Sequence, residues 1–435
     1  MLHKFRRQLR SFPGLIDVLQ CSLEHFFSEK IEEKFEKIEK MFSKDPRRYY
    51  YIEYEETVPY PIQWWKLLND IRRQGYHLNM RIHTQIQKLQ EVLLFDYIAE
   101  ILEAHGFLKL PEDPFLKQIM ENVTHSRSFI YQLSIAANYL SNRFNVSFPE
   151  ITGSGTVDVK AEKDGKGILV ECKSIEPPYY NSLAAEILRI MQRARLNKIL
   201  FVKINKPPYD RKSAKNLAIR IIKSCQSKIK DDDFELDVIS LPHIINETVK
   251  YEDFSPIPHI FNWLPEGLKK NCLKSDRTYF AGDVKTFGSR IIIKNPKIII
   301  LKEQDEEKIL TTKLLRSLRE SKNQLEKEDG RNFLNYARII CVDLSNIVGR
   351  LSNIVSEGGI KPIDAIKREK INSLKNIVIK WLESHQDITD VVLSVSSLYM
   401  DRLGSYLTLK FECIPAMNIN QAIYPRGWCL EMMIK

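Results

Sequence analysis

The sequence predicts a multidomain α/β protein, and three features of its 435 residues indicate this class. Helical spacing of apolar residues dominates up to about residue 125. From residue 126, amphipathic helices alternate with short apolar runs that are typical of strands. A second mixed region begins near residue 285. A chain of this length has enough material for two or three domains of roughly 150 residues each.

We expect four regions along the chain. Residues 1–125 form a mainly helical N-terminal region, and residues 126–230 form an α/β domain. The acidic, proline-bearing residues 231–284 are expected to be a linker or an irregularly packed segment. Residues 285–435 form a mixed α/β C-terminal domain whose role is unknown.

Composition places the chain among globular proteins. Hydrophobic residues make up 43% and aromatic residues 10%, and no run approaches the ~18 apolar residues of a membrane span. Residues 1–21 lack the long apolar run and the small-residue cleavage site of a secretory signal. The seven cysteines include no CxxC pair, which fits neither a disulfide framework nor a zinc ribbon. We expect a cytoplasmic protein with no membrane partner.

The net charge of +10 is unevenly distributed. Residues 189–230 contain thirteen Lys or Arg and one acid, Asp210. Such a block binds phosphates by releasing condensed counterions, although a solvated helix face in a basic protein has the same composition. The residues expected to contact nucleic acid are Arg189, Arg193, Arg195, Arg211, Lys212 and Lys215.

The first part of the α/β domain predicts the order helix, strand, strand, strand, helix, strand. The Asp164-Gly165 step between the second and third strands is a strong signal for a hairpin turn. "TGSGT" at residues 152–156 predicts a turn that enters this hairpin. The predicted elements are, in order, 126–144, 145–148, 155–161, 167–174, 181–196 and 198–204.

The C-terminal region also mixes helix and strand patterns. Asp343 ends an apolar strand, where a functional side chain and a capping side chain are both plausible. The basic helix from Lys313 to Lys327 could contact a nucleic-acid backbone, but its charge alternation is equally that of a solvated helix. The predicted elements are strand 289–302, helix 307–328, strand 337–345 and strands 390–399 and 406–414.

Asp158, Glu171 and Lys173 lie on the two arms of the predicted hairpin. Glu171 and Lys173 are two residues apart on one strand, so their side chains project from the same face. Two carboxylates and a backbone carbonyl such as that of Cys172 suit a magnesium ion that keeps several waters. A neighbouring lysine can hold the attacking water, which indicates phosphodiester hydrolysis. The alternative is a surface hairpin whose charges are solvated.

This arrangement resembles the PD-(D/E)xK nuclease superfamily, whose restriction-endonuclease-like fold has a helix leading into a hairpin with Asp and Glu-x-Lys. The match is "VD" at 157–158, with Val157 where the family has proline, and "ECK" at 171–173. The resemblance spans residues 126–206 and implies a mixed sheet flanked by helices. It also implies that Asp158 and Glu171 bind Mg²⁺ or Mn²⁺ and that Lys173 is the catalytic lysine.

Two glutamines occupy further positions of the family pattern. Many members carry a glutamate on the leading helix, where this chain has Gln132 in "QLSIAANYL". Gln132 supplies no charge, so the number of metal ions stays open. Some members carry a glutamine on the helix after the Glu-x-Lys strand, and Gln192 is the candidate for that position.

The resemblance therefore implies a metal-dependent endonuclease, with DNA favoured over RNA as the substrate. The first alternative is a catalytically inactive protein that keeps the fold and binds nucleic acid or serves as a scaffold. The second is an interaction module that needs a partner protein from a defence or repair assembly. A homodimer also stays open.

Overall fold

The computed structural model divides the chain into two compact units. The first comprises Met1–Glu39, Val58–Glu176 and Glu307–Lys435, and the second comprises Lys40–Thr57 and Pro177–Glu306. The structure describes residues 12–27, 30–43, 58–76, 83–108, 114–121, 126–175, 179–196, 198–208, 210–227, 231–239, 248–250, 278–287, 290–302, 306–328, 336–345, 361–400, 407–417 and 429–434. No helix in these ranges is long and apolar enough to cross a membrane.

The described residues up to Glu121 form helices. Aromatic side chains connect them: the rings of Trp64 and Phe95 lie 5.2 Å apart, and those of Phe27 and Phe95 lie 5.3 Å apart. Gly106 ends the longest of these helices with a φ of 72°, a conformation that glycine adopts without steric cost. The helices are α1 (Phe12–Phe27), α2 (Lys30–Ser43), α4 (Tyr60–Arg73), α5 (His83–Ala104) and α6 (Pro114–Glu121).

A helix and a three-stranded meander follow, as the sequence predicts. Asp164 and Gly165 both have positive φ, which is the geometry of the tight turn expected between the second and third strands. β1 pairs with β2 and β2 with β3, both antiparallel. The elements are α7 (Ser126–Ser141), β1 (Asn145–Ser147), α8 (Pro149–Thr152), β2 (Val159–Lys163) and β3 (Lys166–Ser174).

These strands belong to a mixed seven-stranded sheet with the order β1-β2-β3-β9-β10-β11-β12. β3 and β10 both run parallel to β9, whereas the remaining neighbours are antiparallel. The sheet confirms the expected α/β class with a mixed sheet. The strands from the C-terminal part of the chain are β9 (Ala337–Asp343), β10 (Asp390–Met400), β11 (Leu407–Pro415) and β12 (Cys429–Ile434).

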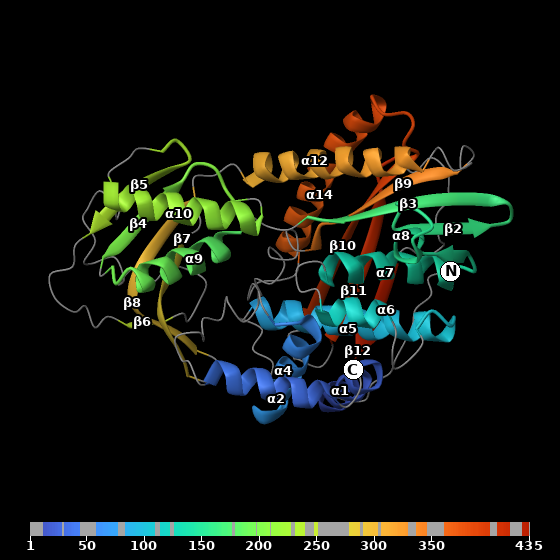
Figure 1. The fold of residues 1–435 in the computed structure, drawn as a ribbon. Helices are drawn as coiled ribbons and strands as arrows, with labels where there is room; N and C mark the ends of the chain where they lie inside the picture. The colour runs from blue at the N-terminus through green and yellow to red at the C-terminus, as the bar shows by residue number, and fades with distance from the viewer. Residues whose placement is uncertain are drawn as a thin grey trace. The chain divides into compact units, whose positions relative to one another are not determined.

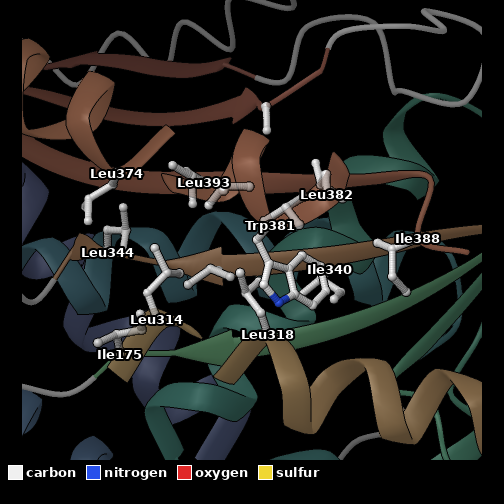
Figure 2. Close-up of a cluster of buried hydrophobic side chains, with 14 of the residues drawn as sticks. Ile175, Leu314, Leu318, Ile340, Leu344, Leu374, Trp381, Leu382, Ile388 and Leu393 are labelled. Atoms are coloured by element: carbon white, nitrogen blue, oxygen red, sulfur yellow. The ribbon is translucent and has the colours of Figure 1, made fainter. Parts of the chain in front are cut away.

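Helices cover both faces of this sheet. Figure 1 shows α12 (Glu306–Lys327) and α14 (Lys361–Glu383) on one side and α5, α6 and α7 on the other. Under α12 and α14, leucine, isoleucine, valine and tryptophan side chains form a continuous buried cluster, part of which Figure 2 shows. Its members include Leu314, Leu318, Ile340, Trp381 and Leu393. Burying these side chains between helix and sheet holds this half of the unit together.

Strand 198–204, which the sequence predicts in the same domain as the hairpin, lies in a different sheet from it. The predicted helix 181–196 and this strand form α9 (Tyr180–Arg193) and β4 (Ile199–Ile204) in the second unit. In the first unit, the strand that lies parallel to β3 is β9, and the helix that precedes it is α12. The apolar pattern of such a strand is compatible with a buried position in either sheet. The local pattern therefore predicted both elements but not the sheet that β4 joins.

The second unit is built on a separate sheet with the order β5-β4-β8-β6, with β7 also paired to β8. Within the segment 231–284, expected to be a linker or an irregularly packed segment, residues 234–239, 248–250 and 278–284 are strands of this sheet. Residues 231–233 form a turn before β5, and the other residues of the segment lie outside the described ranges. The first unit contains both residues 126–176 and residues 307–435, which the sequence predicts to belong to two separate domains. The further elements are α10 (Arg211–Ser227), β5 (Phe234–Ile239), β6 (Thr248–Lys250), β7 (Thr278–Phe287) and β8 (Arg290–Lys302).

Replacing Leu318 with alanine should destabilise the first unit by about 2–5 kcal/mol, because Leu318 is fully buried between α12 and the sheet. Urea denaturation followed by far-UV circular dichroism would measure the loss. Arg319→Ala, at the next and exposed position of α12, is the matched control and should change stability by less than about 0.5 kcal/mol. Equal effects of the two substitutions would contradict the described packing of α12.

Candidate functional site

β3 presents Glu171 and Lys173 on the face of the sheet that α12 covers, as the two-residue spacing predicts. The Lys173 Nζ lies 2.6 Å from the Glu171 Oε1. The Glu171 side chain is completely buried, whereas the Lys173 side chain is 25% exposed. Leu169 and Ile175, on the same face, belong to the apolar cluster. The ion pair therefore lies within an apolar environment that strengthens its electrostatic interactions.

Asp158 approaches β3 from the segment that precedes β2. Its Oδ2 accepts a hydrogen bond of 2.6 Å from the backbone N–H of Cys172, and its Oδ1 accepts one of 2.9 Å from Gln132 Nε2. Val157, beside it, is fully buried and anchors this segment in the core. The structure thus brings Gln132, Asp158, Glu171 and Lys173 together from α7, the pre-β2 segment and β3.

The two carboxylates interact with each other in a buried setting. Burial raises the pKa of Asp158 well above its usual value, and the nearby charge of Glu171 raises it further. Burial likewise raises the pKa of Glu171 to about 7, against the opposing effect of Lys173. Burial lowers the pKa of Lys173, but attraction to Glu171 and Asp158 outweighs this effect and the pKa is raised overall. One lysine therefore only partly compensates the pair, and a bound cation would complete the charge balance.

The oxygen atoms around this pair fit a divalent cation. Glu171 Oε2 is buried and has no hydrogen-bond partner among the described residues. The Cys172 N–H points away from β9 toward Asp158, and strand geometry directs the Cys172 carbonyl to the same side. The β2–β3 ladder stops at Val159 and Val170, so this carbonyl lies beyond it. No group of three His, Cys, Asp or Glu residues in the described ranges could by itself hold a metal ion. A cation here would therefore need waters besides two carboxylates and a carbonyl.

A third carboxylate, missed in the sequence, lies near the pair. Glu150 on α8 hydrogen-bonds to Asp158 and contributes to raising its pKa. Its backbone N–H also donates to the Val157 carbonyl over 3.2 Å, which draws α8 toward the pre-β2 segment. The only local signal was a glutamate after Pro149, which is typical of the first turn of a helix.

The final turn of α12 and the residue that directly follows the helix supply two further contacts that the sequence did not reveal. Lys173 Nζ donates a hydrogen bond of 2.7 Å to Gln324 Oε1. Four residues later, the buried Glu328 accepts hydrogen bonds from the Thr156 N–H and, over 2.7 Å, from the Thr156 Oγ1. A side chain at Gly155 would approach both Glu328 oxygens to 3.1 Å, so a glycine permits this contact. The C-terminal end of α12 therefore holds both Lys173 and the segment leading to Asp158.

The glutamine that the structure places beside Lys173 is Gln324. Gln192 is on α9 in the second unit, and its side chain lies outside the described residues. The second unit also contains the predicted nucleic-acid contacts, which are Arg189, Arg193, Arg195, Arg211, Lys212 and Lys215. Of these, Arg189 forms an ion pair with Glu186.

Asp343 has a local capping contact. It accepts a 2.8 Å hydrogen bond from the Ser345 N–H and another from the Ser345 Oγ. Alternation along β9 places it on the opposite face from Val342, which pairs with Lys173. Asp343 therefore does not join the carboxylates at Lys173, and the capping alternative describes its observed contacts.

Comparison with known proteins found no family model, no curated protein and no solved structure that matches the chain. Support for a function therefore comes from the carboxylate–lysine site, here called the β3 site and comprising Gln132, Asp158, Glu171, Lys173 and Gln324.

Without metal, the stability of the protein should fall as the pH rises from about 4.5 to 7. Glu171 has an ordinary pKa of 4.5 when unfolded and about 7 when folded, so the folded state binds its proton more tightly. Glu171→Gln cannot ionise and should weaken this dependence, raising stability at pH 8 by about 1–3 kcal/mol. Urea denaturation in EDTA at pH 5 and pH 8 would measure the difference. The control is Glu326→Gln, which changes an exposed glutamate of α12 and should keep the wild-type dependence of stability on pH. If stability depended on pH identically in all three proteins, the burial of Glu171 would be refuted.

Thr156→Val should cost about 1–3 kcal/mol, because the buried Glu328 carboxylate loses a hydroxyl donor while the side-chain shape is kept. Thr156→Ser retains the hydroxyl and should lose less than half as much stability. Thermal unfolding of the two variants and wild type would compare these effects. Equal losses in both variants would show that the methyl group, not the hydrogen bond, matters at this position.

Proposed function

We propose that this protein is a metal-dependent nuclease with a restriction-endonuclease-like core, and that the β3 site hydrolyses phosphodiester bonds. The observation that carries the proposal is the buried pairing of Asp158 with Glu171 beside Lys173. Buried carboxylates with raised pKa values are costly for stability, and such groups are concentrated at functional sites.

The order of elements around the β3 site supports the proposed core. α7 leads into an antiparallel meander of three strands, and α12 then leads into β9, which is parallel to β3. This is the helix, hairpin, helix, strand order of the resemblance, with the second unit inserted between β3 and α12. The proposed core therefore extends from α7 to β9 rather than ending near residue 206.

Magnesium or manganese would be held by Asp158, Glu171 and the Cys172 carbonyl, whose oxygens fit a hard cation. When bound, the cation would neutralise charge on the scissile phosphate and acidify a water. Lys173 would orient the attacking water or the phosphate, while its hydrogen bond to Gln324 fixes its position. Gln132 and the Cys172 N–H hold Asp158 in place.

A second candidate function is nucleic-acid binding without hydrolysis. Protein donors already bond to both oxygens of Asp158, which is also what a purely structural carboxylate requires. The uncharged Gln132 reduces the negative charge available to a cation. DNA is the favoured substrate because of the family resemblance, and action in a reducing cytoplasm remains our expectation.

Cleavage assays on linear duplex, circular duplex and single-stranded DNA and on RNA would test the nuclease proposal. We expect cutting in magnesium or manganese that EDTA abolishes and that Asp158→Asn or Lys173→Ala reduces at least 100-fold. Lys166→Ala changes an exposed lysine at the other end of β3 and should leave the rate unchanged. Well-folded wild-type protein that binds these nucleic acids but cuts none of them would instead favour the binding function.

A further inference from the structure

The helix α10 in the second unit has one buried face and one strongly basic face. Its buried residues pack into a cluster with α9 and β4. Its sequence contains five Lys or Arg and no Asp or Glu. The residues that anchor the helix to the unit are Ala214, Leu217, Ala218, Ile221 and Ile222.

The exposed side of α10 carries a continuous stripe of four side chains. Lys212, Lys215, Ile219 and Lys223 are exposed and follow one another at intervals of three or four residues. Such spacing places side chains along a single helix face. Eleven residues separate the first and last lysines, or about 16 Å of helix, a length that spans several successive phosphates of a nucleic-acid strand.

The three lysines of this stripe are not neutralised by the protein in the part of the chain that the structure describes. Arg220, on the same helix, forms ion pairs with Asp231 and Asp233. Lys212, Lys215 and Lys223 have no acidic partner in the described ranges.

Two cations on α12 show the other arrangement, in which a basic side chain has an acidic partner on the same helix. On α12, Arg316 pairs with Glu320 and Lys322 with Glu326, both four residues apart. This pattern is that of an ordinary solvated helix. The stripe on α10 differs because its positive charge stays available for a partner.

The beginning of α10 strengthens this positive potential. Asp210 caps the helix by accepting a 2.6 Å hydrogen bond from the Ser213 N–H. Arg211 and Lys212 follow in the first turn, where the helix dipole is already positive and cations are unfavourable. Placing cations there costs stability but creates a stronger site for an anion.

We propose that the stripe Lys212–Lys215–Ile219–Lys223 binds the phosphate backbone of nucleic acid, so that the second unit holds the substrate that the first unit cleaves. The choice of nucleic acid as the partner rests on the proposed nuclease function. The ammonium groups would contact phosphates, and Ile219 would pack against the apolar edge of a sugar. Contacts of this kind give affinity and strong salt dependence but no sequence preference.

Fluorescence anisotropy with a labelled, mixed-sequence DNA duplex would test this surface in EDTA, where cleavage is not required. Lys212→Glu/Lys215→Glu should weaken binding at least 10-fold at moderate salt and reduce the log–log salt slope by about two. The matched control is Lys34→Glu/Lys37→Glu, the same change of net charge on exposed positions of α2, which should weaken binding less than about 2-fold. Circular dichroism would establish that both variants fold.

Equal weakening by the two charge reversals, or no weakening by either, would overturn the proposal. Vesicles containing phosphatidylserine form a second arm of the test. If the α10 variant lost vesicle binding but kept DNA binding, a membrane surface would replace nucleic acid as the partner. Stripe-dependent DNA binding without any cleavage would refute only the nuclease, whereas cleavage with stripe-independent binding would refute only this surface.

Discussion

The parallel pairing of β3 with β9 is the interaction on which the rest of the first unit depends. Ile168 to Ser174 align residue by residue with Ala337 to Asp343, which joins segments far apart in the chain. Parallel neighbours need a crossover, and here α12 provides its last part and packs over Glu171 and Lys173. Without this pairing the α7–β3 segment would lack both the covering helix and the apolar cluster that surrounds its charges.

This arrangement explains how charged side chains can be kept inside an apolar layer. The contacts that hold them come from three elements: Gln132 from α7, the Cys172 N–H and Lys173 from β3, and Gln324 from α12. The hydrogen bonds are incomplete, since Glu171 Oε2 has no partner in the part of the chain that the structure describes. A buried polar network that is only partly satisfied lowers stability, and such a cost is typical of sites built for a ligand or a reaction.

Under the proposed function, the insertion of the second unit separates two tasks within one chain. Its connections enter directly after β3 and leave directly into α12, the two elements that bear Lys173 and Gln324. The first unit contains buried carboxylates, whereas α10 of the second unit exposes three lysines that have no acidic partner among the described residues. Hydrolysis needs a small, water-poor site, and backbone binding needs an extended, exposed and positive surface, so the two are readily placed on different units.

The sequence by itself determined the local features of this protein. Two-residue spacing placed Glu171 beside Lys173, the Asp164-Gly165 step predicted the hairpin, and the α/β class with a mixed sheet is confirmed. Only the tertiary structure decided that β9 follows β3 in the sheet, that β4 joins another sheet, and that Gln324 lies at Lys173. The reason is physical: periodicity reports which face of an element is buried, but not the distant element that buries it. Gln324 lies 151 residues from Lys173, and no local pattern encodes a contact across that separation.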